Sequence, residues 1–435
     1  MNLKRIFFFL LLSVFFAFEV SAHITKKADK ELQTVDREYE ENIRSILLYP
    51  ITSTPIITDV LQPAVMSLND PRTLLLSFDE MGNEVKNYYV RILNCNADWT
   101  LSNLNAIMFL TDYDEYQIFD RQSSNNTRMP YIHYKFPLPK TKISGNFIVM
   151  VYRDGDDQDI ILTKRFMIYE NNVTITPQIK FPVSNSERNT GQQTDFSISY
   201  NSSIQNPMER MSVVVRQNNN WSNAITTLKP VYMRDDVSTY DYIFFNNENV
   251  FKGGNEFRFF DLRNLKGGGM NVNKITFSAN KNEAILTYDK SRVGNAYSTM
   301  YDINGSYSPE QYDTKLFEID PDYALVTFTL DMKQQDVPGR VFIMGALSDW
   351  ELNADFEMKW DAVNNFFTCT VMLKQGYYNY CYVVLPKGAP AASNTILEGS
   401  FAQTQNYYDF IVYYRGPGAM YDAIAGYKSV NYLGK

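Results

Sequence analysis

The sequence predicts an all-β fold, built from three consecutive antiparallel β-sandwich domains that follow a signal peptide. Short apolar runs alternate with turn residues at a spacing of roughly ten residues, which is typical of antiparallel sandwiches. The 435 residues include 31 Tyr and 29 Phe, and aromatic side chains pack well on pleated surfaces. Long stretches with helical periodicity are scarce. Together these three observations predict strands rather than helices throughout the chain.

The first 22 residues have the pattern of a cleavable signal peptide. A basic pair, Lys4 and Arg5, precedes the apolar run 6–18, and small residues allow cleavage after Ala22. The run is too short to span a bilayer comfortably, and an uncleaved signal anchor is the alternative. No later apolar run is long enough for a membrane helix. We therefore expect an exported, soluble mature protein.

Composition excludes several classes of function. The formal net charge is −8, with 41 Lys and Arg against 49 Asp and Glu, and nucleic acid binding requires clustered cations. Two histidines and three cysteines exclude most metal sites built from these residues. No nucleotide loop, metalloprotease motif or nucleophile elbow occurs, and His133 fits a packed or surface role. We expect no enzyme activity, no catalytic residue, no cofactor and no metal.

A polar lead-in, residues 23–42, is expected to be flexible, and the first β-sandwich domain is expected over residues 43–172. The segment DGDDQD, residues 154–159, separates two predicted strands of this domain. Its DxD spacing is compatible with calcium binding, but a polar break that contains glycine is more simply a hairpin turn. Residues 95–109 lack strict alternation and are expected to form a connection with a short helix or an irregular strand. The predicted strands are Ser45–Tyr49, Thr73–Phe78, Tyr88–Leu93, Tyr131–Phe136, Asn146–Tyr152 and Ile160–Tyr169.

The second β-sandwich domain is expected over residues 173–321. Turn residues separate its strands, and among them the triple glycine 267–269 lacks the Lys-Ser/Thr that a phosphate loop needs. A flexible turn is the simpler interpretation of these glycines. The predicted strands are Val173–Ile179, Thr194–Tyr200, Met211–Arg216, Tyr240–Phe245, Asn255–Asp261, Ile275–Phe277 and Ala284–Tyr288.

The third β-sandwich domain is expected over residues 322–415, followed by a loosely ordered, glycine-containing tail over residues 416–435. Gly376 and Tyr378 stand in a Gly-x-Tyr pattern just before a strand. This pattern is like the tyrosine corner of immunoglobulin-type sandwiches, in which the Tyr hydroxyl bonds back to the turn and the chain crosses between sheets. The predicted strands are Ala324–Leu330, Val341–Met344, Phe366–Leu373 and Tyr378–Leu385.

Three cysteines cannot all pair within one exported chain. Cys369 and Cys381 flank the turn near Gln375, where a simple hairpin would place them opposite each other. A tyrosine corner would separate them instead, and Cys95 has no evident partner. We therefore predict free or buried thiols.

Two segments of the third domain, 341–350 and 373–384, resemble early-set domains, which include the glycogen-binding modules of amylase-type proteins. The resemblance implies an immunoglobulin-like early-set fold and a tryptophan, here Trp350, that can stack on sugars. Those modules usually carry a second tryptophan after the Tyr-rich strand, and residues 383–394 contain none. A structural role for Trp350 is favoured, and glycan binding through Trp350 is the alternative.

The chain carries an ordered set of short motifs, each of them weak alone. They are IRSILLYP (43–50), CNADW (95–99), YIHY (131–134), SGNF (144–147), QNNNW (217–221), GNEFRFFD (254–261) and DING (302–305). In its order and spacing this set resembles the type IX secretion system plug protein family, and the resemblance spans nearly the whole mature chain. The family implies a soluble periplasmic β-protein without catalytic residues. It also implies docking on the large outer-membrane translocon barrel, whose periplasmic opening the protein closes.

Two candidate exposed loops carry tryptophan among small polar residues, an arrangement that suits protein interfaces. One loop contains Asp98 and Trp99, and the other contains Trp221. We take these three residues as candidate partner contacts, with the alternative that both tryptophans cap their own cores. The sequence thus favours a periplasmic protein that associates with the outer membrane through a barrel partner, and an exported glycan-binding protein is the rival interpretation.

Overall fold

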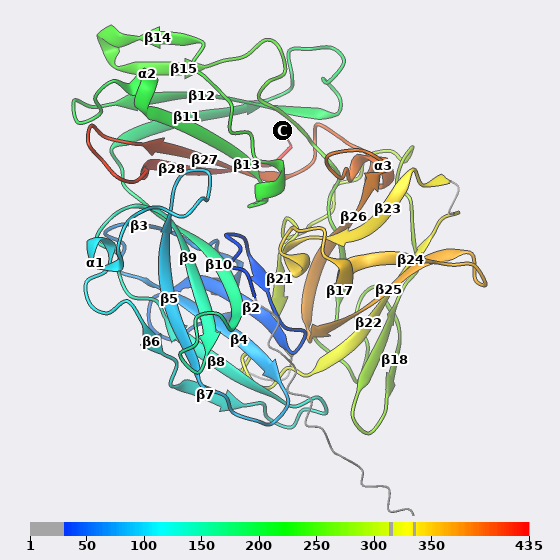
Figure 1. Ribbon diagram of the computed structural model, residues 1–435. Coiled ribbons are helices and arrows are strands. Elements are labelled where there is room, and N and C mark those ends of the chain that lie inside the picture. The colour runs from blue at the N-terminus through cyan, green and yellow to red at the C-terminus, as the bar shows by residue number, and fades with distance from the viewer. Residues whose placement is uncertain (1–29, 313–315, 334–335, 435) are drawn as a thin grey trace, which may run out of the picture.

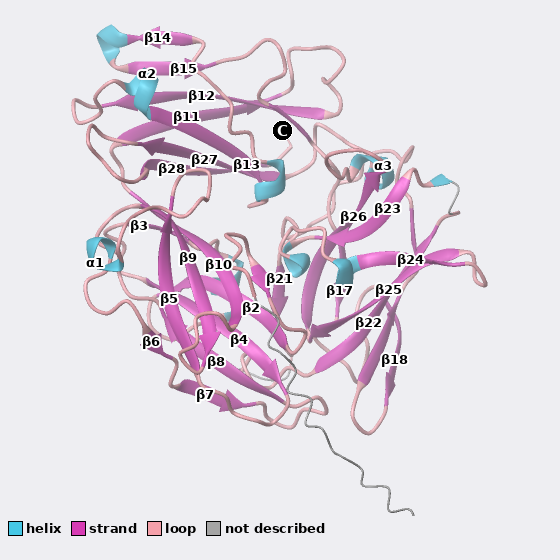
Figure 2. Cartoon of the chain, viewed as in Figure 1, coloured by secondary structure: helices cyan, strands magenta, loops and turns pink. Residues whose placement is uncertain are grey.

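The computed structural model of the chain describes residues 30–312, 316–333 and 336–434. The predicted signal peptide lies outside these residues. The described chain is built almost entirely of strands, with three α-helices of four residues each (Figure 2). The predicted all-β fold is therefore confirmed. None of the described helices is long and apolar enough to cross a bilayer.

The strands form three lobes (Figure 1). In the first lobe, the sheet β2-β4-β8-β7 packs on β5, β6, β9 and β10 around a large apolar core. The lobe contains β1 (Arg37–Glu38), β2 (Ile43–Ile51), β3 (Val65–Ser67), β4 (Thr73–Met81), β5 (Tyr88–Cys95), β6 (Tyr116–Gln117), β7 (Asp120–Ser123), β8 (Tyr131–Pro137), β9 (Gly145–Arg153) and β10 (Ile160–Tyr169), with η1 (Ile57–Leu61) and α1 (Ala106–Phe109).

The second lobe combines strands from two distant parts of the chain. The sheet β11-β12-β15-β14 packs on β13, β27 and β28. The lobe contains β11 (Val173–Lys180), β12 (Gly191–Tyr200), β13 (Met211–Gln217), β14 (Tyr232–Arg234), β15 (Thr239–Tyr242), β16 (Val250–Lys252), β27 (Asn406–Tyr414) and β28 (Ala423–Tyr432), with α2 (Pro207–Arg210), η2 (Trp221–Asn223) and η3 (Asp235–Val237).

The third lobe is one extended sheet with the order β17-β26-β23-β24-β25-β22-β19-β18, which surrounds its own core. The lobe contains β17 (Arg258–Asp261), β18 (Val272–Phe277), β19 (Asn282–Leu286), β20 (Asp289–Lys290), β21 (Tyr307–Pro309), β22 (Tyr323–Asp331), β23 (Gly339–Met344), β24 (Glu357–Asp361), β25 (Phe366–Lys374) and β26 (Gly376–Pro386), with η5 (Ala346–Ser348), η6 (Ala354–Phe356) and α3 (Thr395–Glu398).

The lobes do not follow one another in simple chain order. Strand β17, which the sequence analysis placed in the second domain, pairs with β26 of the third lobe. Strands β27 and β28 return to the second lobe, where β27 pairs with β13 from Met211↔Tyr414 to Gln217↔Tyr408. The expectation of a loosely ordered tail is wrong, because β28 pairs with β27 and buries Ile424 and Ala425.

Strand β27 explains this return physically. Phe410 and Val412 belong to the core of the second lobe, whereas Ile411 and Tyr413 pack toward the first lobe. All four side chains are at most 1% exposed. A strand that is apolar on both faces is stable only between two packed layers, so the end of the chain is held there.

The expectation of a flexible lead-in is also wrong for residues 30–42. Strand β1 pairs with β10, and Lys30 binds both Glu40 and Asp159 at 2.6 and 2.9 Å. The Val35 carbonyl accepts a hydrogen bond from the Thr163 hydroxyl at 2.8 Å. Polar side chains thus fasten this segment to the edge of the first lobe.

The turn and thiol predictions agree with the structure. Residues 154–159 join β9 and β10, which pair as an antiparallel hairpin. The Tyr378 hydroxyl donates to the Lys374 carbonyl at 2.6 Å, as expected of a tyrosine corner. Cys369 lies opposite Phe328 and Cys381 opposite Met344, and all three cysteines are free and buried.

Candidate functional site at the junction of the lobes

Trp99 and Trp221 meet between the first and second lobes. Their ring centroids are 5.1 Å apart and the rings are edge to face at 80°. The Arg165 guanidinium lies 4.6 Å from the Trp99 ring, and that of Arg216 lies 4.5 Å from the Trp221 ring. Two loops that the sequence analysis treated separately therefore form one contact.

Local turn chemistry turns the Trp99 indole inward. The Trp99 amide donates to the Asn96 carbonyl at 3.0 Å, and the Asn96 amide donates to the Thr100 carbonyl at 2.8 Å. Trp99 adopts a φ of 65°, a left-handed conformation that is costly for a bulky residue and persists only where packing enforces it. Trp99 is 6% exposed, so its indole is internal. Asp98 is exposed beside it, and hydrogen bonds from Thr100 lower the pKa of its carboxyl.

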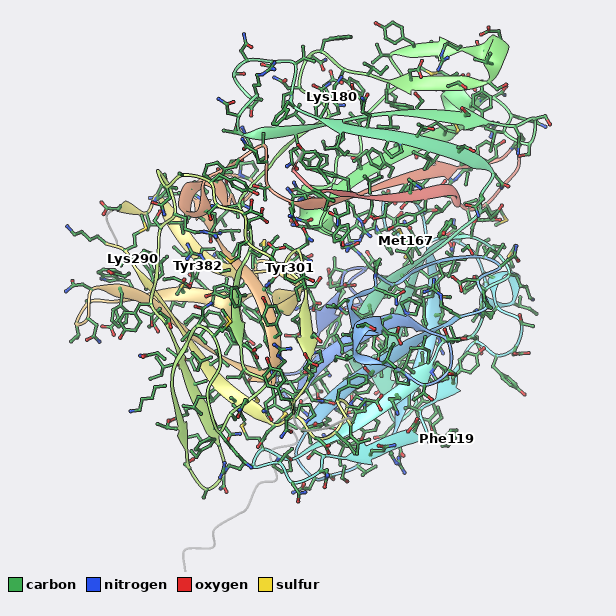
Figure 3. All side chains as sticks on the ribbon, turned by 180° about the vertical axis from the view of Figure 1, so that it is seen from behind. Phe119, Met167, Lys180, Lys290, Tyr301 and Tyr382 are labelled. Carbon is green, nitrogen blue, oxygen red and sulfur yellow. The ribbon has the colours of Figure 1, made fainter. Side chains whose placement is uncertain are left out.

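An apolar layer surrounds the tryptophan pair. Met167, which Figure 3 labels between the first and second lobes, packs with Trp99, Ile148 and Tyr413 in this layer. The Tyr413 hydroxyl donates to Asn146 Oδ1 at 3.0 Å. The layer joins the first lobe to β27 and to β28, which pairs with β10 at Tyr169↔Ile424.

Trp350 stands in the loop after β23, at the inner edge of the third lobe. Its amide donates to the Gly345 carbonyl at 3.0 Å, and its φ is 60°. The indole meets Phe257 edge to face, with centroids 5.8 Å apart, and it lies directly over Gly305, where an added Cβ would come within 2.4 Å of the ring. Trp350 is partly buried, and its cover comes from segments outside its own loop.

A cavity of about 910 Å³ opens between the three lobes. Residues 35–38 of the first lobe, the η2 turn of the second lobe and the Trp350 loop all line it. Its volume lies at the upper end of the roughly 300–1,000 Å³ range of ligand sites. Three other cavities between described residues measure only about 180, 50 and 20 Å³, so the interlobe cavity is the candidate binding site.

Comparison with known proteins identifies the first lobe. Residues 43–170 match the model of the first domain of the type 9 secretion system plug protein. The first lobe is therefore a type IX secretion plug domain. It thereby has a role in type IX secretion, and the family is a secretion component rather than a known enzyme family.

The whole architecture recurs in a crystal structure of a hypothetical protein from Parabacteroides merdae. The two structures superpose with a TM-score of 0.86 at 28% sequence identity, over 92% of this chain and 100% of the other. No curated protein matches the sequence. This chain and the Parabacteroides protein thus share the arrangement of all three lobes.

Charged side chains also lie where the lobes meet. Lys164 of β10 binds Asp349 of the third lobe and also binds Asp36 at 3.2 Å. Burial opposes the charge on Lys164, but the two carboxylates outweigh it and raise the lysine pKa. Burial and the neighbouring Asp349 raise the pKa of Glu38 to about 7. Burial also raises the pKa of Glu351.

A second charged cluster lies buried between the first and third lobes. Asp79 Oδ1 is 2.6 Å from His133 Nδ1, and Asp79 Oδ2 accepts from Lys374 Nζ at 2.7 Å and from the Tyr323 hydroxyl at 2.6 Å. Asp79 is 0% exposed and His133 is 4% exposed. Burial works against the carboxylate, yet Lys374 and His133 lower the pKa of Asp79. This cluster fixes the first lobe to the third.

The sequence analysis missed this cluster. It expected a packed or surface His133, and the structure places this residue in the interior. The partners come from β4, β8, β22 and β25, so no sequence spacing links them. The one available signal was Asp79 at the end of the mostly apolar run LLLSFD (74–79), because a carboxylate in a central strand must find a partner. No group of three or more His, Cys, Asp and Glu side chains among the described residues could hold a metal ion.

Proposed function

We propose that this chain is a non-enzymatic periplasmic plug of the type IX secretion system. A cleavable signal peptide exports it, and it docks on the large outer-membrane translocon barrel, whose periplasmic opening it closes. The family match over residues 43–170 carries this proposal. The exported leader expected from the sequence supports the periplasmic location.

The contacts between the three lobes support a plugging role. A translocon wide enough for folded cargo would leak unless a broad, stiff body blocked one end. The buried Asp79–Lys374 pair joins the first lobe to the third, and the Trp99–Trp221 pair joins the first to the second. These joints favour a body that moves as one unit over three lobes connected by free hinges.

Affinity purification tests the docking. The tagged full-length chain is recovered from detergent-solubilised outer membranes, and a very large barrel protein should accompany it. Deletion of the chain should also make the outer membrane permeable to a large antibiotic such as vancomycin, and re-expression should restore the barrier. Recovery of the chain without any large membrane protein would contradict the proposal.

Among the three candidate contacts, Asp98 is the one that the structure leaves exposed. We propose that Asp98 contacts the partner, whereas Trp99 and Trp221 hold the loop in place. Asp98→Lys should reduce recovery of the barrel without changing the melting temperature. Equal recovery with Asp98→Lys would remove this loop from the interface.

A further inference from the structure

The interlobe cavity has walls that suit the backbone of an extended peptide. Asn220 uses its side-chain oxygen to accept from the Ser222 amide at 2.8 Å, and Asn353 does the same for the Asp355 amide at 3.0 Å. Both residues line the cavity. Their oxygens are engaged, so their Nδ2 groups are the donors offered to a ligand, and backbone carbonyls are strong acceptors for such donors.

The lining of the same cavity holds four carboxylates, those of Asp36, Glu38, Asp349 and Glu351, against two cations, Arg37 and Lys252. The Lys164 ammonium already forms ion pairs with Asp36 and Asp349. Glu38 has its nearest cation, Arg44, at 3.8 Å, and no hydrogen bond or ion pair among the described residues involves the Glu351 carboxylate. A cationic ligand group would stabilise both glutamates in their charged forms.

An apolar floor lies next to these carboxylates. Phe257, Met344 and Val383 line the cavity together with Trp350. The aliphatic stem of an arginine or lysine can pack on such a floor while its charged end reaches a carboxylate.

We propose that the interlobe cavity binds an extended peptide segment of a partner protein that carries arginine or lysine, with the basic group directed to Glu38 and Glu351 and the backbone along Asn220 and Asn353. A glycan fits less well, because neutral sugars bring no cation and the Trp350 indole is wedged against Phe257 and Gly305. The binding itself stands apart from barrel docking. Only the source of the peptide, a protein of the secretion machinery, rests on the proposed function.

Isothermal titration calorimetry of the full chain tests the proposal. The probe is acetyl-(Ala-Arg)₃-amide, which in an extended conformation presents its arginines on one face. The matched control peptide is acetyl-(Ala-Gln)₃-amide. We expect the arginine peptide to bind about tenfold more tightly, and Glu351→Gln to remove most of that preference, as expected from the loss of one close charge pair.

Charge-matched controls separate the cavity from general attraction to an acidic protein. Asp112→Asn and Asp114→Asn remove charge from an exposed loop of the first lobe and should leave the arginine preference unchanged. The proposal would be overturned if the two peptides bound equally well, or if the double variant Glu38→Gln with Glu351→Gln kept the arginine preference. It would also be overturned if the Asp112 and Asp114 variants lost the arginine preference to the same extent as Glu351→Gln. Tighter binding of maltohexaose than of the arginine peptide would overturn it in favour of a glycan.

Recovery of the barrel by the wild-type chain is measured in a separate experiment. The plug role can therefore fail while peptide binding holds, and peptide binding can fail while the plug role holds.

Discussion

Trp99 and Trp221 come from different lobes and pack edge to face, with 5.1 Å between their ring centroids. Arg165 lies near both rings, at 4.6 Å from that of Trp99 and 5.8 Å from that of Trp221. Aromatic pairs of this geometry contribute about 0.5–1.5 kcal/mol beyond the area they bury. The pair therefore couples the stabilities of the first and second lobes.

Trp99→Ala should destabilise the protein by about 3–5 kcal/mol, the usual cost of truncating a buried aromatic side chain. Trp221→Ala should cost less, because Trp221 is only partly buried. Urea unfolding of both single variants and the double variant gives the coupling energy, which should be about 0.5–1.5 kcal/mol. Additive single effects would show that the rings are neighbours without energetic coupling.

Removal of one partner of the Asp79–Lys374 pair should be strongly destabilising. Asp79→Asn leaves the buried Lys374 charge uncompensated, and such a loss costs about 3–5 kcal/mol. The variant Asp79→Asn with Lys374→Met should recover part of the loss. Urea midpoints of wild type, Asp79→Asn and the double variant at pH 7 measure this order, and a double variant less stable than Asp79→Asn would contradict it.

The same pair predicts sensitivity to acid. The folded-state pKa of Asp79 is lowered, so the folded state binds fewer protons than the unfolded state in acid. The contribution is therefore fully present above the unfolded pKa of about 3.9 and is lost as the pH falls through the folded pKa. Asp79→Asn should show a flatter stability profile than wild type below about pH 4.

Glu38 should act in the opposite direction. Its folded-state pKa is raised from 4.5 to about 7, so the folded state holds a proton that the unfolded state releases. The stabilising contribution is present below pH 4.5 and is lost as the pH rises through 7. Glu38→Gln should therefore raise the melting temperature more at pH 8 than at pH 4.5, and the exposed control Glu84→Gln should not. Equal shifts at both pH values would contradict the raised pKa.

Local pattern predicted most strands, because alternation and turn residues are local properties. Strand β10 has the predicted bounds, Ile160–Tyr169. The partners of a strand are not local, and the sequence analysis did not foresee that β27 joins β13. The run YYDFIVYY (407–414) is nearly continuously apolar, which is typical of a strand buried on both faces. That signal predicts that both faces of the strand are buried, but it does not reveal which lobe packs on each face.

The candidate site was predictable only in part. The tryptophans were recognised from their loops, but the contact between Trp99 and Trp221 depends on how two lobes pack. The three-lobe cavity has the same origin, since the residues near Glu38, Asn220 and Trp350 that line it come from three different lobes. Tertiary packing of this kind leaves no mark on sequence spacing.

Trp350 decides between a structural role and the glycan-binding alternative. Its indole rests on Gly305, and its ring centroid lies 5.8 Å from that of Phe257. Trp350→Ala should therefore lower the melting temperature. Neither wild type nor this variant should be retarded on an α-glucan gel. Gly305→Ala is a matched probe, because its Cβ would come within 2.4 Å of the ring and displace the indole without removing it. Gly305 also has a φ of 79°, so this variant carries backbone strain as well. Both variants should melt earlier than wild type. Wild-type retardation that disappears in a Trp350→Ala protein of normal stability would instead establish an exposed sugar-binding indole.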